Sequence, residues 1–206
     1  MVSQSAENGQ ELQELADAGL TLCKPVVLVG MMGAGKTAVG TALAALLDVP
    51  FLDSDREIEA AANCTIAEIF ARDGEVFFRD RETEILTRLL QAAPGVLSTG
   101  GGAFLAERNR AVIAKHGISV WLDADLELLW SRVRHKTTRP LLLTDDPKAT
   151  LTEIYETRVP FYAKASLRVK AAPELSIEQM ALRVKDALVA TPGVVKTMPV
   201  GTASRG

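Results

Sequence analysis

The sequence predicts one α/β domain built around a largely parallel sheet. Short apolar segments with the length of strands alternate with longer segments whose apolar residues recur at helical spacing. A glycine-rich loop joins the first of these strands to a helix. The chain has 206 residues, of which 48% are hydrophobic and 24% charged, as is typical of a single globular domain.

The glycine-rich loop is the most informative segment. The apolar stretch 25–29 runs into Gly-Met-Met-Gly-Ala-Gly-Lys-Thr at 30–37, and the Ala/Leu-rich stretch 38–47 follows. This is the strand–loop–helix setting that the phosphate-binding motif G-x-x-x-x-G-K-[ST] requires, and it disfavours the alternative of an ordinary tight turn. The glycines let backbone N–H groups point at an anion. Lys36 is expected to reach the outer phosphates, and the Thr37 hydroxyl to bind Mg²⁺.

The next elements lie between this loop and residue 92. A short helix is possible over 10–20, before the first strand, and a second strand is predicted over 49–53. A helix is expected over 56–62, and the capping box Thr-Ile-Ala-Glu that begins at Thr65 opens another. Residues 75–92 have apolar side chains at helical spacing and are predicted to be a helix.

The second half of the chain continues the alternation. Strands are predicted in the apolar runs 95–98, 118–122 and 167–169. Helices are predicted over 106–116, 126–133, 150–165 and, after the Ser176 capping box, to residue 189. Pro160 should bend or end its helix, because proline lacks the N–H group. Residues 134–148 are predicted to be a loop, and the tail after 191 to be disordered.

Charge and cysteine content exclude several classes of protein. The net charge of −3 leaves no basic footprint for a nucleic acid. Cys23 and Cys64 lack metal-type spacing and predict a reducing compartment. We find no apolar run long enough to span a membrane and no signal-peptide core in residues 1–19. We therefore expect a cytoplasmic protein without a nucleic-acid or membrane partner.

Three polar clusters follow predicted strands: the phosphate loop, Asp53-Ser54-Asp55 and Gly100–Gly102. Because ligands bind at the carboxyl ends of parallel strands, the clusters predict a single active site. One aspartate could help to hold Mg²⁺, and the other could take a hydrogen bond or a proton from a substrate hydroxyl. The alternative for Asp55 is a helix cap. The triple glycine favours close approach of a ligand over a flexible connector.

Several charged residues have two interpretations. Arg79 and Glu82 are three apart on a helix, so they form either a solvated pair or a partly buried site for a bound acid. The basic segment 132–139 is either plain surface or part of a lid that closes over a nucleotide. Asp123 could bind Mg²⁺, but we interpret it as the cap of the following helix.

Taken together, these motifs resemble the shikimate kinases over about residues 25–190. The shared motifs are GMMGAGKT at 30–37, FLDSD at 51–55, FR-x-x-E at 78–82, TGGGA at 99–103, RPLL at 139–142 and R-x-P-x-Y at 158–162. The phosphate loop alone occurs in very many proteins. The ordered set is specific, and its last two motifs discriminate most.

The resemblance implies a nucleoside-monophosphate-kinase-like P-loop NTPase fold, with a five-stranded parallel sheet flanked by helices and a mobile lid at about 134–148. It implies ATP- and Mg²⁺-dependent phosphorylation of the shikimate 3-hydroxyl, in the chorismate pathway of aromatic amino acid synthesis. We expect an N-terminal extension at 1–20, the kinase-like domain at 21–190 and a disordered tail at 191–206. We expect a monomer that acts on shikimate and ATP.

The resemblance also implies a role for each site residue. Catalysis would fall to Asp55 as the candidate base, with Lys36 and Arg139 at the phosphates. ATP would be bound by Gly33, Ala34, Gly35, Lys36, Thr37, Ala38, Arg132 and Arg139. Shikimate would be bound by Asp55, Arg79, Glu82, Gly100, Gly101, Gly102 and Arg158, its carboxylate by the two arginines Arg79 and Arg158. Thr37 and Asp53 would hold Mg²⁺.

Two other functions stay open at this point. A kinase for another hydroxylated acid, such as gluconate, would share the phosphate loop and a nearby acidic residue, but the TGGGA, RPLL and R-x-P-x-Y motifs disfavour it. A nucleotide-binding regulatory module would bind ATP without turnover. The presence of Asp55 and of the lid arginine disfavours that alternative.

Overall fold

A parallel sheet of five strands lies at the centre of the part of the chain that the computed structural model describes, residues 19–135 and 140–198. In spatial order the strands are β3 (Phe51–Asp53), β4 (Val96–Ser98), β2 (Val26–Val29), β5 (Ile118–Asp123) and β6 (Leu167–Lys170). Every neighbouring pair in this sheet is parallel, as predicted. The order puts the strand that precedes the phosphate loop in the middle of the sheet.

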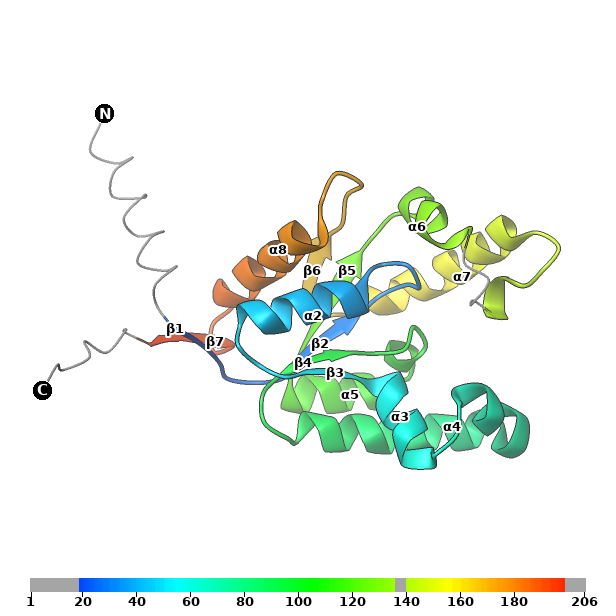
Figure 1. Cartoon of the computed structure of the whole chain (residues 1–206), viewed down its shortest axis with the longest axis horizontal. Coiled ribbons are helices and arrows are strands. Elements are labelled where there is room, and N and C mark those ends of the chain that lie inside the picture. Colours follow the sequence, from blue (N-terminus) through cyan, green and yellow to red (C-terminus); the bar gives the residue numbers. More distant parts are fainter. Residues whose placement is uncertain (1–18, 136–139, 199–206) are drawn as a thin grey trace, which may run out of the picture.

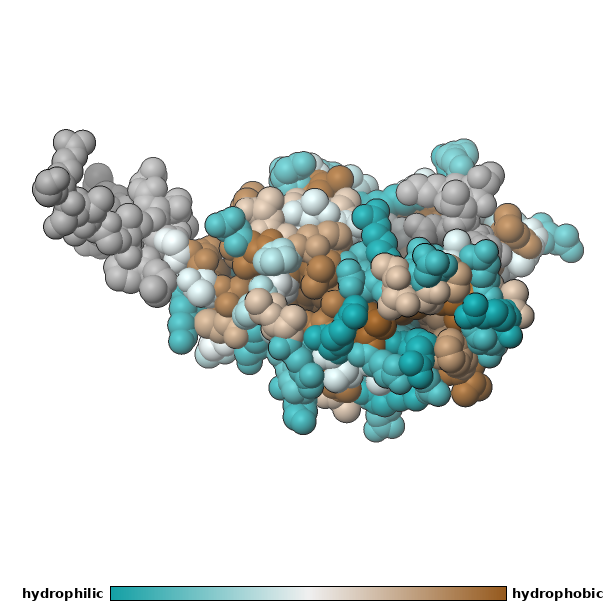
Figure 2. Space-filling view, turned by 60° about the horizontal axis from the view of Figure 1, so that its bottom comes forward, coloured by the Kyte–Doolittle hydropathy of each residue, from teal (hydrophilic) through white to brown (hydrophobic). Residues whose placement is uncertain are grey.

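Helices cover both sides of the sheet (Figure 1). They are α2 (Lys36–Leu46), α3 (Ser54–Ala62), α4 (Ile66–Leu90), α5 (Glu107–His116), α6 (Leu126–Val133), α7 (Pro147–Tyr162) and α8 (Ile177–Val189), with 3₁₀ turns at Ala103–Leu105 and Pro140–Leu142. Helices α2 and α8 pack together along one side of the sheet, and α4 and α5 along the other. Figure 2 shows hydrophilic side chains interspersed with smaller hydrophobic patches on one face of the molecule.

The hydrophobic core lies between the sheet and these helices. All four residues of β2 are completely buried, as is usual for a strand with helices on both faces. Leu43 of α2, Leu129 of α6 and Leu188 of α8 are also completely buried in the same core. A second, smaller cluster joins α3 to α4. Within the described residues, no helix is long and apolar enough to cross a membrane.

Most predicted elements are confirmed, with small shifts at their ends. Helix α3 begins at Ser54 because the Asp53 side chain caps it. The helix after Thr65 and the helix predicted at 75–92 form one element, α4, which is kinked at Gly74 (φ 82°, ψ 174°). Its predicted capping box is present. Helix α7 begins at Pro147 rather than 150, and it ends at Tyr162, two residues after Pro160.

The two ends of the described chain pair with each other. Strand β1 (Gly19–Leu22) lies antiparallel to β7 (Val195–Met198), and Val194 is 1% exposed. The ladder extends from the end of the molecule away from α6 and α7 (Figure 1). The predicted boundaries at 20 and 191 therefore cut through an ordered pairing, and the prediction of a disordered tail is wrong for 195–198. The helix possible at 10–20 is not formed at residues 19–20, and the rest of it lies outside the described residues.

Candidate active site

The phosphate loop has the predicted strand–loop–helix form. Gly30 has φ 140°, and a Cβ there would lie 2.9 Å from the Leu122 carbonyl oxygen, so the turn requires glycine. The ammonium group of Lys36 donates to the carbonyl oxygens of Gly30 (2.8 Å) and Met31 (3.0 Å), so it curls back across the loop. Because α2 begins at Lys36, its N–H groups and positive dipole end face the space in front of the loop.

A cavity of about 500 Å³ runs along this loop. The cavity is lined by Met32–Val39, Asp53, Asp55, Ser98–Gly101, Arg132, Ala171, Ala172, Leu175–Ile177 and Met180. The phosphate loop, the paired aspartates and part of the triple glycine therefore meet at the carboxyl ends of β2, β3 and β4, as the sequence predicts. Apolar residues from the segment between β6 and α8 form another part of the wall.

Asp53 joins the phosphate loop to α3. Its Oδ1 accepts hydrogen bonds from the backbone N–H groups of Asp55 (3.1 Å) and Arg56 (3.5 Å), so Asp53 is the N-cap of α3. Its Oδ2 accepts a hydrogen bond from the Thr37 hydroxyl at 3.4 Å. The cap that the sequence left open for Asp55 is thus formed by Asp53, and the side chain of Asp55 is free of that task.

Asp55 lies in a setting that makes its carboxylate more basic. Burial, and then the nearby charge of Asp53, raise its pKa above 3.8, while Lys36 and Arg79 act in the opposite direction. A Cβ on Gly100 would lie 2.7 Å from Asp55 Oδ1, so a side chain at this position would displace the carboxylate. The Asp55 carboxylate is therefore suited to accept a hydrogen bond or a proton from a ligand in the cavity.

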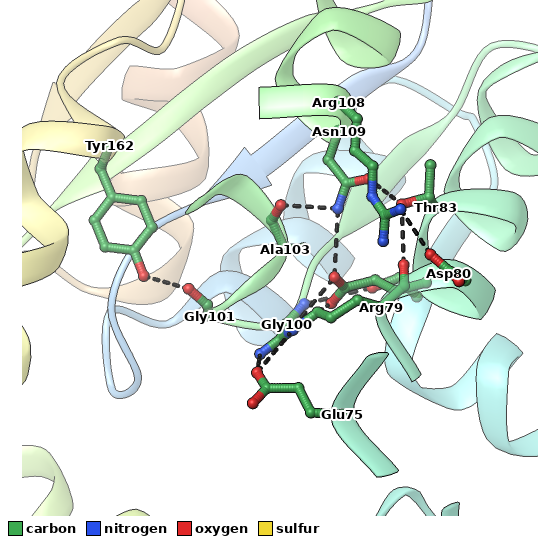
Figure 3. Close-up of polar contacts among 12 residues, drawn as sticks. Glu75, Arg79, Asp80, Thr83, Gly100, Gly101, Ala103, Arg108, Asn109 and Tyr162 are labelled. Carbon is green, nitrogen blue, oxygen red and sulfur yellow. Dashed lines mark hydrogen bonds and ion pairs between the residues drawn. The ribbon is translucent and has the colours of Figure 1, made fainter. Parts of the chain in front are cut away.

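Arg79 is held between two glutamates of α4 (Figure 3). Its Nη1 donates to both carboxylate oxygens of Glu82 at 3.3 Å, and its Nε and Nη2 donate to Glu75 at 3.2 and 3.1 Å. The Glu82 side chain is 2% exposed and the Glu75 side chain 66%. Burial raises the pKa of Glu82, and the Arg79 charge opposes that rise. The interpretation as a solvated pair is therefore wrong: Glu82 is a buried anchor for Arg79.

The triple glycine lies against three candidate side chains. Gly100 contacts Asp55, as described above. A Cβ on Gly102 would lie 2.8 Å from Arg79 Nη1, and a Cβ on Gly101 would lie 3.4 Å from Arg158 Nη1. The three glycines thus bring an aspartate and two arginines from three different helices to one short stretch of backbone. This arrangement supports the interpretation of the triple glycine as a contact surface rather than a connector.

Tyr162 is a site residue to which the sequence assigned no role. Its hydroxyl donates to the Gly101 carbonyl oxygen at 2.6 Å, and its side chain is completely buried (Figure 3). Burial raises its pKa, so the hydroxyl stays protonated and remains a donor. The bond fixes the triple glycine to α7, the helix that carries Arg158. The signal was present in the motif R-x-P-x-Y, whose tyrosine this is.

The remaining candidates divide into three cases. Arg132 Nη1 donates to the carbonyl oxygens of Gly33 (3.3 Å) and Ala34 (3.4 Å), so this arginine lies against the phosphate loop. Arg139, the predicted lid arginine, lies outside the described residues. The cavity itself is not lined by Arg79, Glu82, Gly102 or Arg158. Arg79 and Arg158 lie against the triple glycine, and Glu82 binds Arg79.

Asp123 is not the helix cap that the sequence suggested. Helix α6 is capped by Asp125, whose Oδ1 accepts from the Leu128 N–H at 2.9 Å. The Asp123 side chain is 2% exposed and accepts two hydrogen bonds from Arg168, at 2.6 and 2.8 Å. Asp123 therefore joins β5 to β6, and the prediction of a cap was wrong by two residues.

The fold and the loop define this chain as a P-loop NTPase. The chain belongs to the shikimate kinase family, because the model of that family, Shikimate kinase, matches residues 32–189. It is 65% identical over 175 residues to the shikimate kinase of Ruegeria pomeroyi, which covers 85% of this chain and 90% of that one. It is 63% identical over 176 residues to that of Cereibacter sphaeroides, with 85% and 88% covered.

Solved structures agree with this family. A shikimate kinase from Acinetobacter baumannii in complex with shikimate has a TM-score of 0.75 and 38% identity, and it covers 81% of this chain and 93% of its own. A gluconokinase from Sinorhizobium meliloti has a TM-score of 0.52 at 17% identity, covering 82% of this chain and 93% of its own. At that identity the likeness shows a shared fold and leaves the substrate open.

Proposed function

We propose that this protein transfers the γ-phosphoryl group of ATP to the 3-hydroxyl of shikimate, giving shikimate 3-phosphate and ADP, in the chorismate pathway. The observation that carries the proposal is the triple glycine, which gathers one carboxylate and two guanidinium groups beside the phosphate loop. A small polyol acid needs arginines for its carboxylate and a carboxylate for its hydroxyl. The shikimate complex of the Acinetobacter relative supports the same choice of acid.

On the nucleotide side, the loop N–H groups and Lys36 stabilise the phosphates. Lys36 exchanges its contacts with the Gly30 and Met31 carbonyl oxygens for phosphate oxygens, where it offsets the charge that develops during transfer. Residues Gly33–Ala38 and Arg132 bind the rest of ATP. Arg139 stays a prediction: it would reach the transferring phosphoryl group from the lid, which was predicted at 134–148.

On the acid side, Arg79 and Arg158 bind the shikimate carboxylate, and Gly100–Gly102 line the pocket. The 3-hydroxyl donates to Asp55, which orients it and takes its proton as the hydroxyl oxygen attacks the γ-phosphorus. The bond between that phosphorus and the bridging oxygen breaks, and ADP leaves. Glu82 acts on the substrate through Arg79, because its own carboxylate is buried beneath that guanidinium.

Thr37 and Asp53 fit a Mg²⁺ ion that accompanies ATP. A hydroxyl oxygen and a carboxylate oxygen face each other beside the phosphate loop, 3.4 Å apart. Mg²⁺ prefers oxygen ligands and takes few from the protein, because water and phosphates complete its shell. When bound there, the ion would neutralise charge on the phosphates. The described residues include no group of three or more His, Cys, Asp or Glu side chains that could hold a metal ion, and this kind of site does not need one.

The proposal extends to the oligomeric state, the partners and the cellular location of the protein. We propose that the active unit is a monomer. The net charge of −3 supports a substrate bound by local arginines rather than a nucleic-acid partner. We propose that the enzyme works in the cytoplasm on shikimate and ATP.

The function is tested by measuring ADP release with ATP, Mg²⁺ and a panel of hydroxylated acids. We expect rapid release with shikimate and only a slow background with gluconate or with no added acid. Faster release with gluconate would replace the proposed substrate. ATP binding without acid-dependent release with any member of the panel would favour a regulatory module.

Arg79→Lys should weaken shikimate binding by about 10- to 150-fold, because lysine lacks the planar fork that grips a carboxylate and charge-assisted bonds are worth roughly 1.5–3 kcal/mol. Calorimetry should show an almost unchanged affinity for ADP. The amide analogue of shikimate should bind the wild type much more weakly than shikimate does, and this loss of affinity should be smaller in the variant. An equal loss of affinity in both proteins would show that Arg79 does not bind the carboxylate.

Gly102→Ala should weaken shikimate binding by about 10-fold, the scale for one charge-assisted hydrogen bond. Gly102 has φ −87°, which alanine adopts readily, but its Cβ would displace the Arg79 guanidinium. Because that guanidinium ends a flexible side chain, the melting temperature should change little. Gly19→Ala is the matched control, since a Cβ at this exposed position in β1 has no neighbouring atom within 4 Å. Equal losses in both variants would contradict the contact with Arg79.

A further inference from the structure

Asn109 on α5 is a completely buried polar side chain that none of the roles above uses. Its Nδ2 donates to the Ala103 carbonyl oxygen at 2.9 Å and to Glu82 Oε2 at 3.3 Å. Its Oδ1 accepts from the Thr83 hydroxyl at 2.7 Å (Figure 3). The amide orientation follows from these partners, because two acceptors face one end of the group and a hydroxyl faces the other.

The two groups that accept hydrogen bonds from Asn109, Glu82 and the Ala103 carbonyl, both belong to the surroundings of Arg79. Glu82 holds Arg79 Nη1 with its two carboxylate oxygens, and it is 2% exposed. Ala103 directly follows Gly102, the backbone against which the same Nη1 packs. One amide group therefore holds both the anchor of the guanidinium and the surface on which the guanidinium lies.

Charge explains why an amide is needed there. A buried carboxylate is stable in its charged form only when hydrogen-bond donors and a cation compensate its lost hydration. Glu82 receives that compensation from Arg79 on its outer side and from Asn109 on its inner side. Without the Asn109 donor, Glu82 would be a weaker anchor, and Arg79 would be free to turn toward exposed Glu75.

We propose that Asn109 is a positioning residue for acid binding: it fixes the Arg79 guanidinium over Gly102 by holding Glu82 and the Ala103 carbonyl together. The inference rests on the proposed function, because its effect is read out through shikimate. Asn109 itself contacts neither substrate. It acts on the affinity for the acid and leaves the nucleotide side of the cavity unchanged.

The test is a double-mutant cycle on the full chain, with dissociation constants for shikimate and for ADP measured by calorimetry. Asn109→Ala should weaken shikimate binding by about 10-fold, the scale for one hydrogen bond to a charged group, and leave ADP binding unchanged. In an Arg79→Lys background, the same change should have little further effect, because the group that it positions is gone. Arg108→Ala is the matched control: Arg108 is the neighbouring residue on α5, half exposed and paired with Asp80, and shikimate binding should not change.

If the loss of shikimate affinity in the double variant equals the product of the losses in the two single variants, Asn109 does not act through Arg79, and the inference is overturned. Equal losses for shikimate and ADP would do the same, since they would indicate general damage to the fold. If Asn109→Ala does not fold, Thr83→Val takes its place, because it removes the partner of the amide oxygen but keeps the shape. It should weaken shikimate binding alone, by about 3-fold, and an unchanged affinity would overturn the inference. Failure of the wild type to bind shikimate would instead overturn the proposed function and this inference together.

Discussion

Asp55→Asn is expected to lower turnover by about 10²-fold or more, the scale for a positioned general base. The substitution keeps the shape of the side chain but removes its charge and basicity. Affinity for ATP should change far less, because Asp55 faces the triple glycine rather than the phosphate-loop backbone. A small and equal effect on turnover and on ATP affinity would contradict the role of Asp55 as acceptor of the hydroxyl proton.

The same substitution is expected to stabilise the fold at neutral pH. Burial and the Asp53 charge raise the pKa of Asp55 in the folded protein above that of the unfolded chain. The contribution of Asp55 to stability is therefore fully present below the unfolded pKa and is lost as pH rises through the folded pKa. At neutral pH the ionised Asp55 carboxylate lowers the free energy of unfolding, and a neutral amide would remove this destabilisation. We expect a higher melting temperature at pH 7 and a smaller difference in acid.

The control for Asp55→Asn is Glu57→Gln, which removes a charge from the same helix outside the cavity, where Glu57 pairs with Arg88 of α4. Turnover in the control should equal that of the wild type. Loss of turnover in both variants would show that any charge on this helix matters, and not Asp55 in particular.

In the wild type, turnover should fall in acid with an apparent pKa above 3.8, because the base must be ionised and its pKa is raised.

Lys36→Ala is expected to reduce phosphoryl transfer by at least about 10³-fold, the upper end for loss of one preorganised donor at a site of developing charge. Alanine favours helix, and Lys36 is the first residue of α2, so the fold should persist. Circular dichroism should be unchanged while ADP release falls to background. Lys115→Ala, a substitution of an exposed lysine on α5, is the matched control. Turnover near normal in Lys36→Ala would refute the catalytic role of the loop.

Local patterns predicted the strand–loop–helix form of the phosphate loop and the position of the paired aspartates beside it. The turn and the strand end are each determined by neighbouring residues, whereas the cap of α3, which the sequence left open for Asp55, is formed by Asp53. Asn109 and Tyr162 could not be assigned in this way. Their partners lie 26 and 61 residues away, at Thr83 and Gly101, so only the folded chain brings them together.

The β1–β7 pairing and the role of Asp123 were also not predicted, because both depend on contacts between distant parts of the chain. Strands β1 and β7 have four residues each, and each pairs with the opposite end of the chain, so neither carries a local signal strong enough to predict a ladder. Asp123 and Asp125 both precede α6, and either could cap it by sequence. Because Arg168 on the neighbouring strand binds the buried Asp123 carboxylate, Asp125 is the residue that caps α6.

The account is tested most directly by following the γ-phosphoryl group itself. The wild-type protein would be incubated with ATP labelled in that group, Mg²⁺ and shikimate, and the product examined by proton–phosphorus NMR. We expect the label on the oxygen of C3, with one ADP formed for each labelled product. Label on another hydroxyl or on the carboxylate, or ADP formed with inorganic phosphate alone, would contradict the account.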